Sequence, residues 1–142
     1  MKETKTLKNY EIVDILKELN DPDSIINSKS SDTKLPVKIL WTISGNIKKL
    51  NDILDLIQEQ EQAINDSYFN EEKSEVNDEG LYVVKSEFRN DFIKEKNDLM
   101  VIENEVELSM INLSDIQDFN FRPSDFMSIN FMIFDDSNAE TD

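Results

Sequence analysis

The chain of 142 residues contains no cysteine and no histidine, and it has only two glycines and three prolines. Without cysteine it can form neither a disulfide nor a thiolate metal site. Without histidine it lacks the commonest general base and the commonest transition-metal ligand of proteins. Two isolated glycines cannot build a glycine-rich phosphate-binding loop. These absences disfavour an enzyme, and we predict no catalytic residue, no cofactor and no metal.

Long hydrophobic runs and a balancing positive charge are also missing. No apolar run approaches the roughly 18 residues of a membrane-spanning helix, and the first residues contain no hydrophobic signal-peptide core. The net charge of −16 opposes binding to nucleic acid or to an anionic membrane, since both are polyanions. It also disfavours an oligomer that crowds acidic faces together. We therefore expect a cytosolic protein whose partner is a protein, one with a basic surface.

The clearest pattern predicts one long helix from Leu35 to about Tyr68. Apolar residues recur there at steps of three and four, and Pro36 suits the first helical turn. The apolar stripe consists of Ile39, Ile43, Ile47, Leu50, Leu54, Ile57 and Ile64. Gly45 lies inside this helix, where it permits the close approach of another helix or else marks a kink.

The charges of this helix are divided by sign. Four lysines and no acid lie between Thr33 and Asn51, namely Lys34, Lys38, Lys48 and Lys49, whereas five acids and no base follow from Asp52 to Asp66. The helix dipole prefers the opposite polarity, at about 0.3–1 kcal/mol per terminal charge, so the apolar stripe has to supply most of the stability. Two interpretations stay open: solvated faces of opposite sign, or a polarised binding surface.

The other patterns predict an α+β fold that is predominantly helical, with shorter helices and a small antiparallel β-hairpin around the long central helix. The shorter predicted helices are Tyr10–Leu19, Glu87–Met100 with Ser86 as its N-cap, and Pro123–Phe134. The predicted strands, Leu81–Val84 and Glu105–Leu113, are expected to pair with each other.

The domain prediction is a single helix-rich domain over residues 1–134. Within it, residues 1–8 are expected to be frayed, and residues 70–80 to form an exposed, mobile acidic loop. Residues 135–142 carry four acids and no base, so we expect a disordered acidic tail.

One acidic segment resembles a metal-binding loop. Asp21 and Asp23 match the opening of a calcium loop, but Ile25 stands at the next ligand position and no glutamate follows at the required spacing. A loop or helix-capping role fits these residues better than a metal site.

Two groups of residues are candidates for binding a partner. Asp52, Asp55 and Glu59 place carboxylates along the long helix. The predicted C-terminal helix is apolar nearly all round, which is typical of a buried helix but also suits a docking surface. The candidate partner-binding residues are Asp52, Asp55, Glu59, Phe126, Phe131 and Phe134.

Four segments together resemble a known family. They are LPVKILWTISGNIKKL, EFRNDFIKEKNDLM, ENEVELSMINLSDI and RPSDFMSINFMI. In layout and residue type the series, over residues 8–134, is similar to a family of small proteins of unknown function encoded by tailed phages and prophages of low-GC Gram-positive bacteria. The resemblance implies a phage origin and a location in the host cytoplasm or on the virion. It carries over no residue roles.

The expected function is therefore non-enzymatic. We expect a phage-encoded protein that binds another protein stoichiometrically, as a virion-assembly or accessory factor. The alternative is an acidic inhibitor that mimics nucleic acid and occupies a basic groove on a host or anti-phage defence protein. The sequence leaves the oligomeric state open.

Overall fold

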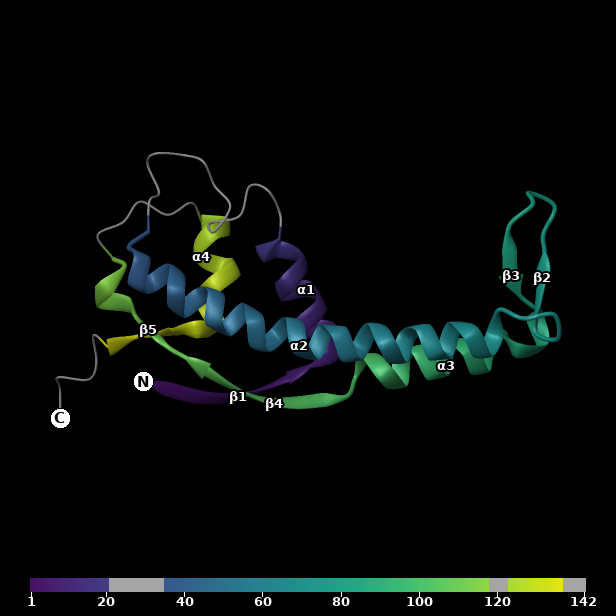
Figure 1. Cartoon of the computed structure of the whole chain (residues 1–142), viewed down its shortest axis with the longest axis horizontal. Coiled ribbons are helices and arrows are strands. Elements are labelled where there is room, and N and C mark those ends of the chain that lie inside the picture. The colour runs from purple at the N-terminus through teal and green to yellow at the C-terminus, as the bar shows by residue number, and fades with distance from the viewer. Residues whose placement is uncertain (21–34, 118–122, 137–142) are drawn as a thin grey trace.

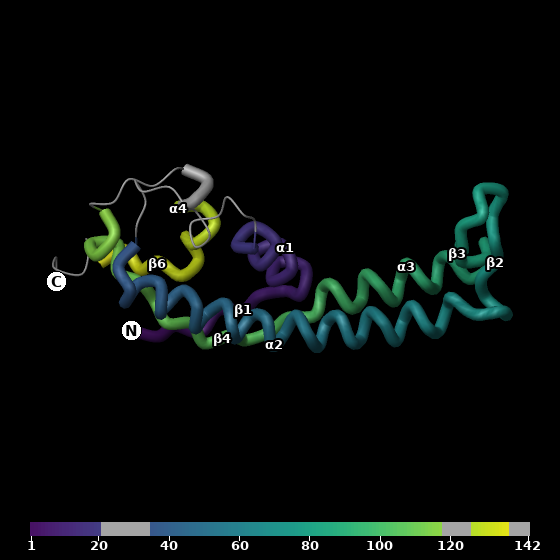
Figure 2. Tube along the Cα trace, turned by 45° about the horizontal axis from the view of Figure 1, so that its top comes forward, coloured from purple at the N-terminus to yellow at the C-terminus, as the bar shows by residue number. Residues whose placement is uncertain are grey.

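The computed structural model describes residues 1–20, 35–117 and 123–136, and shows a base from which a long arm projects (Figure 1). Helix α2 (Val37–Tyr68) runs through the base into the arm, where α3 (Ser86–Met100) lies beside it in both views (Figures 1 and 2). Strands β2 (Ser74–Val76) and β3 (Tyr82–Val84) form the arm tip. The base also contains β1 (Lys2–Lys8), α1 (Asn9–Leu19), β4 (Glu103–Ser109), β5 (Ile111–Asn112), the 3₁₀ turn η1 (Leu113–Asp115), α4 (Pro123–Ile129), the 3₁₀ turn η2 (Asn130–Met132) and β6 (Ile133–Phe134). The predicted α+β fold around one long helix is confirmed.

The apolar stripe of α2 is the centre of the packing. Its 32 residues span about 48 Å at 1.5 Å per residue. Ile39, Ile43, Leu50 and Ile57 are each at most 7% exposed, and the first three belong to the core of the base. The opposite face of α2 is exposed. The helix is therefore held by burial of one face, as its sequence predicts.

The first residues of the chain are not frayed, and that prediction was wrong. Lys2–Lys8 forms β1, which pairs antiparallel with β4 so that Lys5 lies opposite Val106. The segment is mostly polar, and only Leu7 is buried. Its order comes from the backbone hydrogen bonds of a strand about a hundred residues away, which no local pattern indicates.

Buried asparagines join the elements of the base. Asn46 is 1% exposed, and its amide both donates to the Ser109 carbonyl at 2.8 Å and accepts from the Ser109 N–H at 2.9 Å. Asn9 donates to the Leu99 carbonyl at 2.7 Å and accepts from Asn104 at 2.7 Å. The first contact ties α2 to the end of β4. The second joins α1, the last turn of α3 and β4 at the point where the arm meets the base.

The predicted strand pairing was wrong, although both strands exist. β3 pairs with β2, and β4 pairs with β1. The long strand predicted through Leu113 also breaks at Met110, whose N–H donates to the Met1 carbonyl at 2.8 Å. Beyond the break, β5 pairs in parallel with β6.

Two predicted helix ends also need correction. The C-terminal helix, expected to reach Phe134, ends at Ile129, and the chain then passes through η2 into β6. The apolar residues of that segment serve a strand pair as well as a helix, which explains why they show no single helical face. The N-cap of α3 is Lys85 rather than Ser86, which is its first helical residue. Residues 137–142 of the predicted tail lie outside the described residues.

Leu50 and Leu56 allow a matched test of the α2 stripe, because Leu50 is fully buried and Leu56 is 57% exposed. Leu50→Ala should lower the free energy of unfolding by about 2–5 kcal/mol, since it leaves a cavity in the base. Leu56→Ala should change it by less than about 0.5 kcal/mol. Urea denaturation followed by circular dichroism measures both. Equal losses from the two variants would mean that the stripe is not the packed face.

Candidate protein-binding site at the arm tip

The arm consists of the second half of α2 and of α3, which run antiparallel side by side (Figure 2). Glu61 interrupts the apolar stripe of α2 in this half. It pairs with Lys96 of α3 at 3.8 Å, and the Lys96 ammonium also lies 5.3 Å from the ring centre of Phe92. The Lys96 side chain therefore packs over the Phe92 ring at the point where Glu61 takes the place of an apolar residue in the stripe.

Aromatic rings fix the end of the arm. The ring centre of Phe92 lies 5.3 Å from that of Tyr68 and 5.6 Å from that of Phe69. The Lys73 ammonium lies 4.9 Å from the ring centre of Tyr68 and 5.4 Å from that of Phe88. These residues come from α2, from the turn after it and from α3, so the cluster attaches the tip to both helices.

Tyr68, at the C-terminal end of α2, is 7% exposed. The Glu95 carboxylate of α3 acts on its pKa as a hydrogen-bond acceptor for the hydroxyl. This hydrogen bond, followed by burial and by the charges of Glu95 and Asp91, raises the pKa of Tyr68 to about 12. Tyr68 therefore stays protonated at physiological pH and links the two helices.

A single asparagine shapes the turn that leaves α2. Asn70 Oδ1 accepts hydrogen bonds from the N–H groups of Glu72 at 3.1 Å and Lys73 at 2.9 Å. The Asn70 carbonyl accepts from both the N–H and the hydroxyl of Ser74, at 2.9 Å and 2.6 Å. Asn70 Nδ2 donates to the Ser67 carbonyl at 3.0 Å. This residue therefore aims the chain from the helix into β2.

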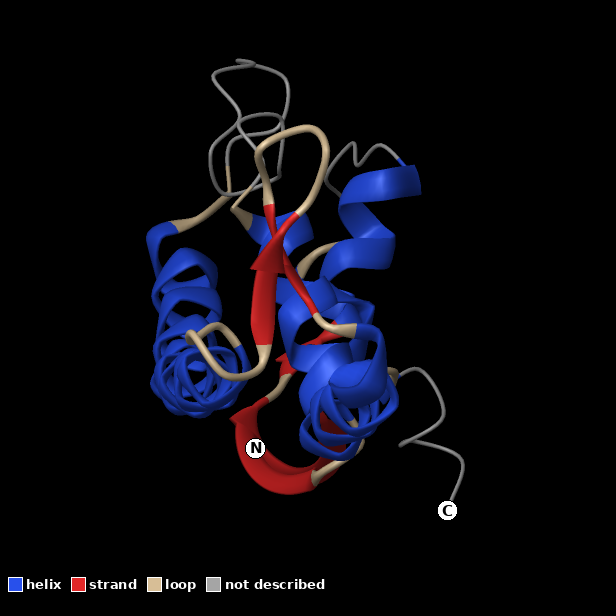
Figure 3. Ribbon diagram, turned by 90° about the vertical axis from the view of Figure 1, so that its right-hand side faces the viewer, coloured by secondary structure: helices blue, strands red, loops and turns tan. Residues whose placement is uncertain are grey.

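The hairpin itself closes through a four-residue turn. The Gly80 N–H donates to the Asn77 carbonyl at 3.0 Å, and Asn77 Oδ1 accepts from the N–H groups of Glu79 and Leu81, both at 2.9 Å. Gly80 has φ of 80°, a conformation that favours glycine. Viewed down the arm from its end, the hairpin lies in front of the two helices and rises away from them (Figure 3).

One face of the hairpin is apolar and changes from buried to exposed along its length. Val76 lies opposite Tyr82 and Ser74 opposite Val84, so all four side chains share a face. Val84 is 6% exposed, next to the helices, whereas Val76 is 55% and Tyr82 72% exposed. The apolar face therefore continues beyond the point where the arm can cover it.

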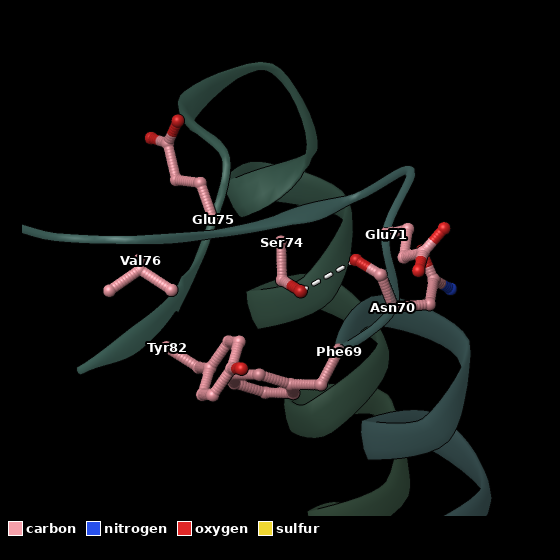
Figure 4. Close-up of a pocket in the computed structure, with 7 residues that line it drawn as sticks. All are labelled: Phe69, Asn70, Glu71, Ser74, Glu75, Val76 and Tyr82. Atoms are coloured by element: carbon pink, nitrogen blue, oxygen red, sulfur yellow. Dashed lines mark hydrogen bonds between the residues drawn. The ribbon is translucent and has the colours of Figure 1, made fainter. Parts of the chain in front are cut away.

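The uncovered part of this face borders a pocket of about 560 Å³ (Figure 4). Its lining residues, which we call the tip pocket, are Phe69, Asn70, Glu71, Ser74, Glu75, Val76 and Tyr82. Apolar side chains supply much of its wall, whereas the Glu75 side chain points away from Val76 and Tyr82, as alternation along the strand requires (Figure 4). The surrounding segment from Glu71 to Glu79 carries five acids and one lysine. Such a pocket suits an apolar group presented on a basic surface.

The predicted carboxylates lie on α2, away from the tip pocket. Asp52, Asp55 and Glu59 are exposed on one face of the helix, opposite its buried stripe. Within the described part of the chain, none of them forms an ion pair or a side-chain hydrogen bond. The structure thus brings these three acids together on an open face.

The predicted phenylalanines lie in the base, at a distance from the acids along the chain and in the fold. Phe126, Phe131 and Phe134 are each half-buried and pack against the core of the base. Met127 of α4 is 75% exposed. The three phenylalanines therefore contribute to packing, and they offer less free apolar surface than the tip.

Sequence reasoning missed the tip residues, because it read residues 70–80 as an exposed, mobile loop. That reading was wrong for Ser74–Val76, which forms β2. The sequence pattern that could have predicted β2 is a turn. A type I turn favours asparagine at its first position and glycine at its fourth, and Asn77 and Gly80 have this spacing between the apolar Val76 and Leu81. The density of acids around it hid this pattern.

Among the residues that the structure describes, no group of three or more acidic, histidine or cysteine side chains could hold a metal ion. No helix in the same residues is long and apolar enough to cross a membrane. Asp21 and Asp23, weighed above as a calcium loop, lie outside them. No protein-family model, curated protein or solved structure matches the chain. Function is therefore inferred from the geometry.

The Tyr68 hydroxyl gives the arm a pH dependence that can be measured. Its pKa is raised from 10.0 to about 12 on folding, so its contribution to stability is present below pH 10 and is lost as pH rises toward 12. Tyr68→Phe removes this contribution and its titration. Wild type should therefore lose more thermal stability than Tyr68→Phe between pH 8 and pH 11. Parallel losses would show that Tyr68 does not link the helices through its hydroxyl.

Proposed function

We propose that this chain is a phage-encoded, non-enzymatic protein that binds a protein partner stoichiometrically, through the tip pocket at the end of its arm. A role in virion assembly, or as an accessory factor, fits a small stoichiometric binder of this kind. The observation that carries the proposal is the exposed apolar face of the hairpin, with Val76 and Tyr82 at its outer end. The phage origin is supported by the resemblance in sequence alone.

The tip is larger than the fold requires. To reverse direction between α2 and α3 the chain uses residues 69–85, whereas connections between packed helices commonly take about 2–8 residues. The additional residues build a hairpin whose outer face exposes a valine and a tyrosine. Exposed apolar patches rimmed by polar residues mark interaction sites, and tyrosine is enriched among residues that dominate binding energy.

The chemistry of the lining supports binding over catalysis. The lining residues of the tip pocket include two acids, Glu71 and Glu75, together with an asparagine, a serine and a tyrosine. The chain has no histidine or cysteine to act with them as base or nucleophile. The five acids of the segment from Glu71 to Glu79 suit a lysine or arginine around an apolar anchor on the partner. The rim would then provide specificity and the apolar wall most of the affinity.

The acids of α2 support one alternative, an inhibitor that mimics nucleic acid. Asp52, Asp55 and Glu59 follow each other at steps of three and four, about 4.5–6 Å along the helix axis. One strand of duplex DNA carries a phosphate every 3.4 Å or so. The stripe is therefore sparser than the polyanion it would imitate, which is why we favour the tip.

Variants of the hairpin test this proposal. Affinity capture from phage-infected cells, followed by quantitative mass spectrometry, should recover a partner with wild type. Tyr82→Ser and Val76→Ser should each reduce its recovery at least about tenfold, because they remove apolar contact at the centre of the site. Leu81→Ser is the matched control: Leu81 is 58% exposed on the same hairpin but does not line the pocket. It should reduce recovery less than about twofold.

The same capture distinguishes the alternative. Asp52→Asn, Asp55→Asn and Glu59→Gln, combined in one chain, should leave recovery unchanged if the tip is the site. Loss of the partner from this triple variant alone, with competition by DNA and a steep salt dependence, would instead favour the mimic.

A further inference from the structure

The outward face of α2 exposes unusually large apolar groups for a helix that runs through the middle of a protein. Val37 is 81% exposed, and Trp41, the only tryptophan of the chain, is 80% exposed. Leu56 on the same side is 57% exposed. Tryptophan is highly buried on average, since its ring gains much by leaving water. Exposed apolar groups of this size are typical of a face that binds another protein surface.

The residues of this face follow a regular spacing. Starting at Trp41, the steps are four, three, four, three and four, which keeps them on one line along the helix. This outer stripe consists of Trp41, Gly45, Lys48, Asp52, Asp55 and Glu59. Apart from its two chain neighbours and the adjacent backbone of its own helix, no heavy atom lies within 4 Å of the position that a Cβ of Gly45 would occupy. The glycine therefore leaves a gap beside Trp41, into which another helix could pack.

The charges of the outer stripe change sign near its middle. Lys48 lies on the basic side and Asp52, Asp55 and Glu59 on the acidic side. Lys48, like the three acids, forms no ion pair with any described residue. The neighbouring Lys49 differs, since it donates to the Glu107 carbonyl at 2.7 Å within the base. The outer stripe thus presents opposite charges in two successive halves that the fold itself does not pair.

We propose that a second copy of this chain binds to the outer stripe, so that two α2 helices pack antiparallel about a two-fold axis. A surface that is positive in one half and negative in the other complements itself in this orientation and in no parallel one. A two-fold interface also makes every contact twice, because residue i of one copy meets residue j of the other and the reverse. Charge complementarity therefore favours a second copy of this chain as the molecule that binds the outer stripe.

The charges also fix the register. When Lys48 of one copy lies opposite Asp52 of the other, the same alignment places Trp41 opposite Glu59 and Gly45 opposite Asp55. Trp41 then lies over the partner helix one turn from Leu56, which provides an apolar contact. Exposed ion pairs contribute little to affinity, so we expect a weak dimer with a dissociation constant on the order of micromolar.

The dimer would present its two arm tips at opposite ends. The two-fold axis falls near residue 50, and Tyr68 lies 18 residues away, so the tips would be separated by roughly 54 Å along the helix axis. The outer stripe and the tip pocket lie on different parts of the chain. Self-association can therefore fail or succeed independently of partner binding at the tip.

The net charge of −16 per chain opposes dimerisation in general, so salt dependence alone does not identify the contact. Charge reversals do. Lys48→Asp makes the chain more negative by two charges, and Asp52→Lys makes it less negative by two. General repulsion would make these variants act in opposite directions. Facing Lys48–Asp52 pairs make both of them lose affinity, because each variant sets like charges against each other twice.

Sedimentation equilibrium of the full chain tests this directly. Wild type should approach twice the chain mass of 16.6 kDa as concentration rises to hundreds of micromolar, and Trp41 fluorescence should shift to shorter wavelength in parallel. Lys48→Asp and Asp52→Lys should each weaken self-association at least about tenfold. An equal mixture of the two variants should dimerise again, because each chain supplies the charge that the other needs.

Lys94→Asp and Asp98→Lys are the matched controls. Like Lys48 and Asp52, Lys94 and Asp98 are exposed residues of opposite charge four positions apart, but they lie on α3, away from the outer stripe. Lys94 Nζ and Asp98 Oδ2 are 4.0 Å apart. Each should change the dissociation constant less than about twofold, and all four variants should keep the thermal midpoint of wild type within a few degrees. The proposal fails if wild type stays monomeric throughout the concentration range. It fails equally if mixing the two α2 variants does not restore the dimer.

Discussion

The apolar face of α2, a helix of 32 residues, sets the architecture of this small chain, because this face has to be covered in both halves of the helix. The base covers its first half with aliphatic side chains from α1, β4 and α4. The aliphatic core of the base does not extend along the second half, where α3 packs against α2. Aromatic rings and lysine stems complete the packing there. The arm, and the tip at its end, follow from this division.

Several elements could be predicted because their information is local. The α2 stripe, the amphipathic α1 and the helix after Ser86 each carry an apolar period within their own residues. Strand β1 could not be predicted, because it is a polar strand with one buried leucine and is ordered by pairing with β4, about a hundred residues away. The pairings of β3 and β4 failed for the same reason: alternation identifies a strand but not its partner. The end of the C-terminal helix was predicted wrongly, because the apolar segment there combines a helix with a short parallel strand.

The candidate site was only partly visible in the sequence. Asp52, Asp55 and Glu59 do share an exposed face, as spacing in a helix requires. The phenylalanines of the C-terminal segment were ambiguous, since an all-round apolar segment suits both a core and an interface, and the structure packs them against the core. The tip pocket is lined by Phe69 and by one face of the hairpin. It arises only when the turn at Asn70 and the turn at Gly80 are both in place.

The central functional claim is that the arm tip, rather than the length of α2 or the C-terminal segment, contacts the partner. Hydrogen–deuterium exchange of the full chain, free and bound to its captured partner, tests this most directly. The account predicts that binding protects the backbone N–H groups of residues 69–76 and 81–83 and leaves those of residues 52–59 and 126–134 unchanged. Protection confined to residues 52–59 or 126–134, with the tip exchanging as in the free protein, would contradict it.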